Sequence, residues 1–278
     1  MKRERLTITL RKDLLDQIDG KIDKVKLRNR SHAIEYYLTK SLGSKISKAL
    51  ILAGGEGAKM RPFTYEMPKT MIPIHGKPIL EYTIELLREN NIKDIYIAID
   101  YLGSKIRDYF SDGHKWGVSI SYIDNNKPCG TAGALQSAKK YFINDAFLMM
   151  HSDILAEIDL LDMIDFAEEE NNILTMALTS IDDPSLYGSV RLRGAKIVEF
   201  SEKPKPDYRA SRLINAGVYI VKPEIFQKFS LKIGSLEREV FPSLVKNSEI
   251  SGYHFAGHWY DISTPKNYER ALKEWKKI

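Results

Sequence analysis

The stretch ALILAGGEGAKMRP, residues 49–62, decides the fold class of most of this chain. It opens as an apolar run of β-strand type and then breaks into three glycines, Gly54, Gly55 and Gly57. Such a loop after a strand is typical of α/β proteins, in which ligands bind beyond the carboxyl ends of parallel strands. The loop has neither the GxxxxGK[ST] nor the GxGxxG spacing, so it predicts neither a P-loop nor a dinucleotide-binding turn.

From residue 48 onward, short apolar strands alternate with stretches of helical periodicity. We expect strands at 49–54, 94–99, 118–123 and 146–153, and helices at 78–90, 102–110 and 131–142. Strands that are spaced by helices of this length form βαβ units. The sequence therefore predicts an α/β body with a Rossmann-like, mainly parallel mixed sheet flanked by helices.

The residues after the glycines favour phosphate binding over a simple turn. Glycine backbone N–H groups can approach phosphate oxygens closely. Three cations follow within eleven residues, namely Lys59, Arg61 and Lys69. Together the glycines and cations predict a loop that holds a triphosphate, and a turn that requires positive φ is the alternative interpretation.

The first 48 residues differ in charge from the rest of the chain. They carry 13 Lys and Arg against 6 Asp and Glu, a net charge of +7, whereas the remainder has a net charge of −2. A basic segment on a near-neutral body suggests a polyanionic partner, with a solvated basic tail as the alternative. We divide the chain into a domain at 1–44, a linker at 45–48 and a second domain at 49–278.

The N-terminal domain reads as one strand and two helices. Residues 5–11, RLTITLR, alternate strictly between apolar and polar side chains and predict a half-buried strand. Residues 12–25 have helical spacing, and Ser31 caps a second helical pattern that Gly43 closes. These elements are too few for a core of their own, so we expect the strand to pair with that of a second copy in a homodimer or a higher even oligomer.

A ribbon made by two copies of this strand fits the DNA major groove, where Arg and Thr reach base edges. The residues expected to face the DNA are Arg5, Thr7, Thr9 and Arg11. Over residues 3–44 the segment resembles the ribbon-helix-helix DNA-binding family, through RLTITLR, DLLDQIDGKI and NRSHAIEYYL. The resemblance implies a small β-α-α domain that binds DNA as a dimer. A dimerisation cap that does not meet DNA is the alternative.

The segment LAGGEGAKMRPFTYEMPKTMIPIHGKPIL, residues 52–80, resembles the signature of sugar-1-phosphate nucleotidyltransferases. Six further motifs follow in the family's order: CGTAGAL, MMHSDILAEIDL, EFSEKP, INAGVYIVKPEIF, SLEREVFP and GHWYDISTPKNYERA. The resemblance covers residues 48–278 and is nearest to mannose- and heptose-1-phosphate guanylyltransferases, through GTAGAL and SLEREVFP. It implies transfer of a nucleotidyl group from an NTP, GTP by preference, to a sugar 1-phosphate, with release of pyrophosphate.

The resemblance also implies roles for single residues. The cations at the reacting phosphates are Lys59, Arg61 and Lys69. The glycines that hold the nucleotide are Gly54, Gly55, Gly57 and Gly130, the last because a side chain there would block the base. The residues of the sugar-phosphate pocket are Glu202, Lys203, Asn215 and Gly217. The ligands of Mg²⁺, the expected cofactor, are Asp153 and Asp261.

Three positions depart from the family pattern. Ala58 and Lys59 stand where the family has Thr-Arg, and lysine lacks the planar fork of arginine. HSD at 151–153 replaces Asn-Gly-Asp, and Ser263 replaces a glycine. Two hypotheses follow: an active enzyme fused to a DNA-binding dimer, or a transcription regulator whose weakened enzyme domain senses nucleotide sugars.

Composition predicts the compartment. Cys129 is the single cysteine, which excludes an intrachain disulfide framework and favours a reducing environment. No apolar stretch approaches the roughly 18 residues that span a bilayer, and residues 1–15 contain no apolar signal core. We therefore expect a cytoplasmic protein without a membrane partner, and without the C-terminal β-helix domain of some family members.

Overall fold

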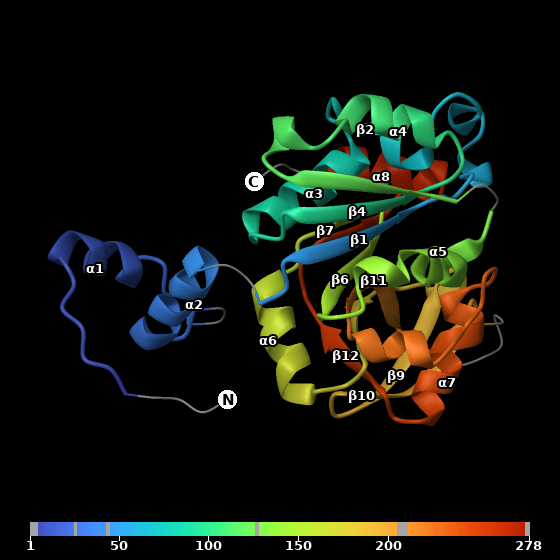
Figure 1. Ribbon diagram of the computed structural model, residues 1–278. Helices are drawn as coiled ribbons and strands as arrows, with labels where there is room; N and C mark the ends of the chain where they lie inside the picture. Colours follow the sequence, from blue (N-terminus) through green and yellow to red (C-terminus); the bar gives the residue numbers. More distant parts are fainter. Residues whose placement is uncertain (1–4, 25–26, 43–44, 126–127, 205–210, 276–278) are drawn as a thin grey trace.

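The computed structural model describes residues 5–24, 27–42, 45–125, 128–204 and 211–275 (Figure 1). They form a small N-terminal unit and a larger α/β body, joined by one segment of chain. None of the helices found in these ranges is long and apolar enough to cross a membrane.

Within the described ranges, nine strands of the body form one sheet with the order β5-β4-β1-β6-β11-β8-β12-β10-β9. The strands are β1 (Lys48–Ala53), β4 (Asp94–Ile99), β5 (Ser119–Asp124), β6 (Phe147–His151), β8 (Leu174–Ser180), β9 (Gly188–Arg193), β10 (Lys196–Glu202), β11 (Leu213–Val221) and β12 (Ile250–His254). The predicted mixed α/β sheet is confirmed. Parallel pairing, however, is confined to β5-β4-β1-β6 and to β8-β12. The sheet is less parallel than predicted because β11 runs antiparallel to both β6 and β8, and β9 and β10 pair antiparallel at the far edge.

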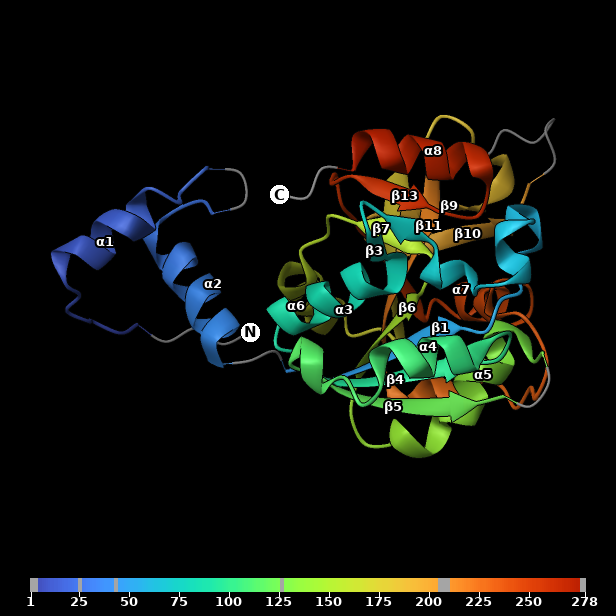
Figure 2. The same cartoon turned by 90° about the horizontal axis from the view of Figure 1, so that it is seen from above.

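Helices cover both faces of the sheet and give three layers (Figures 1 and 2). One face carries α3 (Ile79–Glu89), α4 (Gly103–Phe110) and α6 (Leu160–Glu170), and the other carries α5 (Gly130–Ala138) and α7 (Phe241–Lys246). Successive strand residues point to opposite faces. Thus Ile51 of β1 lies in the core beneath α3, whereas Leu50 lies in the core beneath α5. A strand that is buried on both faces reads as a continuous apolar run, as ALIL does.

A third, smaller core lies beneath α8 (Pro265–Glu274). It places the segment that carries Asp261 beside the end of β6. It includes the two-stranded sheets β2 (Pro73–Ile74) with β3 (Lys77–Pro78), and β7 (Ile154–Ala156) with β13 (Trp259–Asp261). In the register of the second sheet, Asp261 lies opposite Ile154, and the Ile262 N–H donates to the Asp153 carbonyl at 2.9 Å. Backbone pairing thus brings Asp153 and Asp261 together.

The N-terminal unit contains the two predicted helices, α1 (Lys12–Asp19) and α2 (Arg30–Leu42), packed on a small apolar cluster. The first helix is shorter than the predicted 12–25: its last residue is Asp19, and Gly20 is its C-cap. The second begins before Ser31: the Asn29 carboxamide accepts from the His32 N–H at 3.0 Å and takes the capping role that we predicted for the serine. Gly43, predicted to close this helix, lies outside the described residues.

Residues 5–11 form no strand among the described residues of the single chain. Of the three apolar residues of the predicted strand, Leu6 is 81% exposed and Ile8 47% exposed, whereas Leu10 packs against the apolar cluster of the two helices. The predicted partner strand belongs to a second copy of the chain, which would cover Leu6 and Ile8.

The predicted linker at 45–48 belongs in part to the body. Ile46 is only 4% exposed and lies in the core beneath α3 and α6, and Lys48 begins β1. Lys45 pairs with Glu168 of α6, and α2 also contacts α6. The body therefore begins at about residue 45, because these residues complete its core.

Candidate active site

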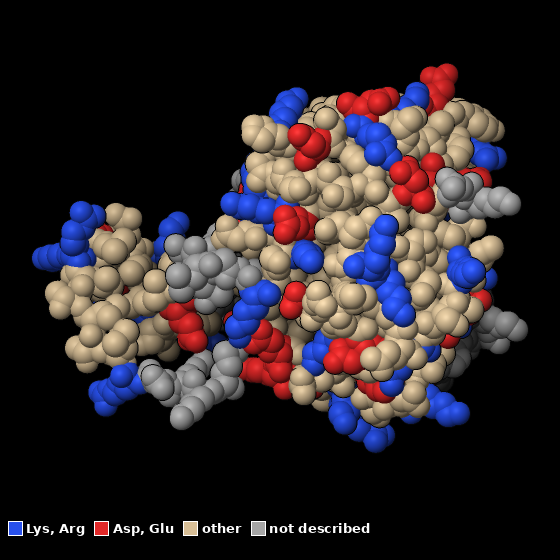
Figure 3. All heavy atoms as spheres, in the orientation of Figure 1, with Lys and Arg blue, Asp and Glu red and all other residues tan. Residues whose placement is uncertain are grey.

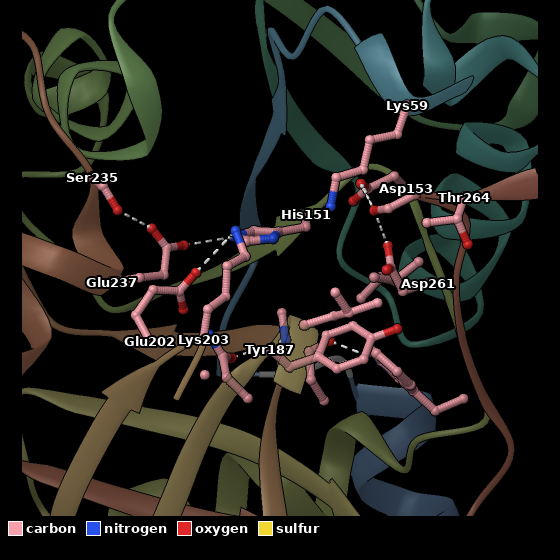
Figure 4. A pocket seen from close by; sticks show the side chains of 18 of the residues that line it. Lys59, His151, Asp153, Tyr187, Glu202, Lys203, Ser235, Glu237, Asp261 and Thr264 are labelled. Atoms are coloured by element: carbon pink, nitrogen blue, oxygen red, sulfur yellow. Dashed lines mark hydrogen bonds and ion pairs between the residues drawn. The ribbon is translucent and has the colours of Figure 1, made fainter. Parts of the chain in front are cut away.

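Two adjacent cavities of about 380 and 390 Å³ open beyond the carboxyl ends of β1 and β6. The loop-side cavity is lined by Gly54, Gly55, Lys69, Gly130 and Thr131, among others. The strand-side cavity is lined by Lys59, Tyr187, Glu202, Asn215 and Glu237, among others (Figure 4). His151 and Asp153 line both cavities, which therefore meet at the end of β6. Ligands of α/β sheets bind at such strand ends.

The glycine loop borders the loop-side cavity with two of its three glycines. A Cβ atom at Gly55 would have no neighbour within 4 Å, and one at Gly54 would lie 3.1 Å from the Cβ atom of Asp100. Gly57 does not line the cavity. Its φ is 62°, and a Cβ atom there would lie 3.0 Å from that of Lys69. Gly57 therefore lets the segment that carries Lys69 approach the loop.

Gly130 lines the loop-side cavity, and the backbone around it gives a reason for glycine that the sequence did not show. Its φ is 69°, and a Cβ atom would lie 2.3 Å from the Gly234 carbonyl oxygen. That carbonyl accepts from the Ala132 N–H at 3.0 Å, and the Gly234 N–H donates to the Cys129 carbonyl at 2.9 Å. This close backbone approach, together with the positive φ, requires glycine at this position.

Lys69, Asp153, Asp261 and Ser263 form one polar cluster at the junction of the cavities. Lys69 comes from η3 (Lys69–Met71), and its ammonium donates to Asp153. The Ser263 hydroxyl donates to Asp261, and its oxygen lies 3.4 Å from Asp153 Oδ2 and 3.4 Å from Lys69 Nζ. A single ammonium thus stands beside two half-buried carboxylates.

Burial and mutual repulsion set the charges in this cluster. Burial raises the pKa of Asp261 to about 6, and the charge of Asp153 adds to this effect. Burial also opposes the charge of Asp153, but Lys69 and His151 outweigh it and lower the pKa of that carboxyl. For Lys69, the attraction of Asp153 outweighs burial and raises the pKa of the ammonium. Lys69 also attracts Asp261, but burial and the charge of Asp153 outweigh that attraction.

The two carboxylates fit Mg²⁺, which binds one or two carboxylates and completes its octahedron with water and phosphate oxygens. A divalent cation between them would relieve the repulsion that raises the pKa of Asp261. In the part of the chain that the structure describes, no group of three or more His, Cys, Asp or Glu side chains could hold a metal ion. The donor set suits a cation that shares its coordination with bound phosphates.

The other two predicted phosphate-binding cations lie apart. Lys59 lines the strand-side cavity and extends toward it in Figure 4. Arg61 lines neither cavity: its Nη2 lies 3.7 Å from a Glu56 carboxylate oxygen, and its guanidinium lies 5.0 Å from the centre of the Tyr65 ring. The reason is local, because Arg61 leaves the 3₁₀ turn η1 (Ala58–Met60) in an extended conformation and its side chain is 46% exposed.

The predicted sugar-phosphate residues all line the strand-side cavity. Glu202 ends β10, and its carboxylate lies 3.2 Å from Lys203 Nζ. In the irregular part of β11, Asn215 accepts from the Gly217 N–H at 3.0 Å and donates to the Tyr219 hydroxyl at 2.8 Å. The Asn215 amide therefore shapes the strand, while Glu202 and Lys203 face the cavity.

The sequence analysis did not single out His151 and Glu237. His151 Nε2 lies 3.5 Å from Glu237 Oε1, and Figure 4 shows both side chains between Ser235 and the Asp153 cluster. The His151 and Glu237 segments, HSD and SLEREVFP, were both noted as motifs. Nothing in their spacing links the two residues, because only the tertiary structure brings them together.

Two aromatic residues, also missed, complete the strand-side cavity. The rings of Tyr187 and Trp259 pack edge to face at 5.4 Å between centres. Trp259 Nε1 donates to the Ala216 carbonyl at 2.9 Å, and the Tyr187 hydroxyl accepts from Asn267 at 3.0 Å. These bonds fix an apolar wall opposite the charged residues.

The predicted DNA-contacting residues lie in the N-terminal unit, apart from both cavities. Their side chains, Arg5, Thr7, Thr9 and Arg11, are exposed. In Figure 3, Lys and Arg side chains lie at the outer edges of this unit, and Asp and Glu side chains gather on the body near it.

Residues 48–277 match the family model described as Nucleotidyl transferase. The chain is 31% identical over 226 residues to mannose-1-phosphate guanylyltransferase catalytic subunit beta of Danio rerio, and 33% identical over 227 residues to mannose-1-phosphate guanyltransferase 2 of Candida glabrata. Each match covers 80% of this chain and 62% of the relative, so the chain spans less than two thirds of their length.

A solved structure of HddC from Yersinia pseudotuberculosis, complexed with GMP-PN, is also similar. The TM-score is 0.72 at 25% identity, and the match covers 83% of this chain and all of that chain. The family model covers most of the chain and includes every residue that lines the two cavities. The chain therefore belongs to the Nucleotidyl transferase family.

Proposed function

We propose that the body transfers a guanylyl group from GTP to a sugar 1-phosphate, with mannose 1-phosphate as the first candidate. The observation that carries this proposal is the junction of two cavities at His151 and Asp153. Two substrates that occupy neighbouring cavities have their reacting groups where the cavities meet, and holding them there removes most of the entropic cost of the encounter.

In the proposed reaction an oxygen of the sugar 1-phosphate attacks the α-phosphorus of GTP. The new O–P bond forms as the bond to the β-phosphate oxygen breaks, and pyrophosphate leaves with the electron pair. The products are GDP-sugar and pyrophosphate. The chain needs no nucleophile of its own for this step, so its contribution is positioning and neutralisation of charge.

Each cavity supplies groups for one substrate. Backbone N–H groups at Gly54 and Gly55 and the Lys69 ammonium suit the nucleotide, and Glu202 with Lys203 suits the hydroxyls and phosphate of the sugar. Asp153 and Asp261 would hold Mg²⁺, which supplies neutralising charge at the phosphates when it is bound.

Similarity supports guanine over other bases. The relatives of at least 31% identity named above are guanylyltransferases, and the HddC structure is complexed with GMP-PN. The choice between mannose, heptose and another sugar is part of the proposal. So is a cytoplasmic location, which the composition predicts.

A substrate panel tests this function. Purified protein is mixed with Mg²⁺, one of four NTPs and one of several sugar 1-phosphates, and pyrophosphate is measured. We expect release with GTP and mannose 1-phosphate. Nucleotide binding without turnover on any pair would instead support the sensor, in which Lys59 in place of arginine no longer promotes transfer.

We further propose that the N-terminal unit makes the protein a DNA-binding dimer. Leu6 and Ile8 are exposed although they are large and apolar, and a partner strand would cover them. The polar residues that alternate with them are Arg5, Thr7, Thr9 and Arg11. These residues would then face the major groove from both strands.

Binding to random DNA fragments, followed by selection and sequencing, tests the DNA proposal. We expect enrichment of a palindromic site, and a steep loss of affinity with salt. A Thr7→Ala, Thr9→Ala variant should lose the sequence preference. A dimer that enriches no sequence would support the dimerisation cap.

A further inference from the structure

A chain of hydrogen bonds connects the two cavities through Glu237. Its Oε2 atom accepts from the Thr131 hydroxyl at 2.9 Å and from the Ser235 hydroxyl at 2.6 Å. Its Oε1 atom faces His151 Nε2 at 3.5 Å. Thr131 lines the loop-side cavity, Glu237 lines the strand-side cavity, and His151 lines both.

The backbone joins the same two walls. The Thr131 hydroxyl oxygen accepts from the Leu236 N–H at 2.8 Å, and the Gly234 carbonyl accepts from the Ala132 N–H at 3.0 Å. The start of α5 and the segment 234–237 are therefore joined by backbone as well as side-chain hydrogen bonds. A ligand that orders the start of α5 from the loop-side cavity would order Glu237 as well.

Glu237 is suited to transmit ordering from one cavity to the other because its two carboxylate oxygens have different partners. A carboxylate oxygen has two lone pairs, and two hydroxyls occupy those of Oε2. Oε1 keeps acceptor capacity toward His151 and the strand-side cavity. The side chain is 13% exposed, so its position depends on these partners rather than on water.

We propose that Glu237 and His151 are positioning residues that couple the two substrate sites: nucleotide in the loop-side cavity strengthens binding of the sugar 1-phosphate in the strand-side cavity. The coupling arises because the first ligand orders a network that the second would otherwise have to order. By linkage, the sugar 1-phosphate strengthens nucleotide binding by the same factor. The proposal rests on the proposed function, since its two ligands are the substrates.

Calorimetry with a nonreactive pair tests the coupling. The nucleotide probe is GTP with a methylene group between the α- and β-phosphorus atoms, which cannot release pyrophosphate, and the second probe is mannose 1-phosphate. The dissociation constant of each is measured alone and with the other saturating. For the natural chain we expect a coupling factor within the usual range of about 5 to 150.

Three variants test the assignment to the bridge. Glu237→Gln keeps the shape but removes the charge and part of the acceptor capacity, and Thr131→Val removes the hydroxyl that reaches Glu237. In both variants the coupling factor, which is measured against each variant's own affinity for the single probes, should fall toward 1. His151→Asn should lower the factor as well.

Glu239→Gln is the matched control. Glu239 accepts from the Ser235 N–H at 2.5 Å and so holds the same segment, but it lines neither cavity. We expect it to keep the coupling factor within about twofold. A lower factor in this variant would assign the coupling to general rigidity of the segment and overturn the role of Glu237.

Two results separate this proposal from the proposed function. If the natural chain binds neither probe, the proposed function fails and the coupling fails with it. If both probes bind but the factor is 1, the coupling is refuted while the proposed reaction stands. If the factor exceeds 1 but is unchanged in Glu237→Gln, the role of Glu237 is refuted.

Discussion

At the residue scale, the site depends on which cation faces the half-buried carboxylates of Asp153 and Asp261. Lys69 donates to Asp153 and lies near Ser263, whereas Arg61 pairs with Glu56 outside both cavities. The two residues are eight positions apart and have the same formal charge. They should differ in function because only Lys69 is placed where charge develops in the proposed reaction.

We predict that Lys69→Met lowers kcat by at least about 10²-fold, which is typical for loss of a preorganised electrostatic group. Arg61→Met, the matched control, should change kcat and KM by less than about threefold, as is usual for an exposed cation. Steady-state pyrophosphate release measures both. Equal losses in the two variants would show that Arg61 reaches the phosphates when substrates are bound.

Two glycines of the loop-side cavity should respond differently to alanine. At Gly130 a Cβ atom meets the positive φ and the Gly234 carbonyl, whereas at Gly55 it meets open space. Gly130→Ala should destabilise the fold by at least about 2 kcal/mol. Gly55→Ala should stay within about 0.5 kcal/mol of the natural chain. Urea unfolding compares them, and a stable Gly130→Ala variant would contradict the close approach.

At the scale of elements, the π-helical turn η8 (Leu236–Val240) carries Glu237 against the start of α5. Burial opposes the charge of Glu237, but His151 and then the hydrogen bonds from Ser235 and Thr131 outweigh it, so the pKa lies below its ordinary value of 4.5. A carboxyl group with a lowered folded-state pKa stabilises the fold above its unfolded pKa, and this stability is lost as pH falls through the folded pKa.

We therefore predict that Glu237→Gln lowers the free energy of unfolding by about 1–3 kcal/mol at pH 7, the usual cost of weakening buried charged hydrogen bonds. The difference from the natural chain should shrink as pH falls below 4.5, because the natural carboxyl then becomes protonated as well. Urea unfolding across pH 3.5–7.5 measures this. A difference that is constant with pH would rule out the charge of Glu237 as its source.

At the scale of the whole molecule, a small basic unit is joined to a three-layer body through α2, residues 45–48 and α6. The cores of the two parts are separate, since the apolar cluster of Ile18, Leu27 and Ala33 shares no residue with those of the body. The body should therefore fold without the N-terminal unit, provided that the cut spares Ile46.

We predict that a chain that begins at Lys45 keeps the melting temperature and pyrophosphate release of the body, whereas one that begins at Ala49 is less stable by at least about 1.5–3 kcal/mol, the cost of losing one buried isoleucine. Thermal unfolding compares the two. Sedimentation should give a dimer for the full chain. The chain that begins at Lys45 should no longer show the assembly that residues 1–44 provide. An unchanged oligomeric state would place the dimer contact in the body.

The sequence by itself determined the alternation of strands and helices, the two-part division and the kinds of residue at the strand ends. These features are encoded locally, since apolar periodicity and glycine loops act over about ten residues. Helix α3, for example, occupies 79–89 within the predicted 78–90. How far the sheet is parallel was harder to predict, because the direction of β11 depends on the path by which the chain returns to the sheet.

Only the tertiary structure decided which of these residues meet. It brought Asp261 beside Asp153 through the pairing of β13 with β7, and joined Glu237 to His151 and Thr131. Such contacts depend on backbone paths between segments far apart in the chain, and no local pattern records them. The sequence thus supplied the chemical groups of the site, and the packing of the layers selected which of them act together.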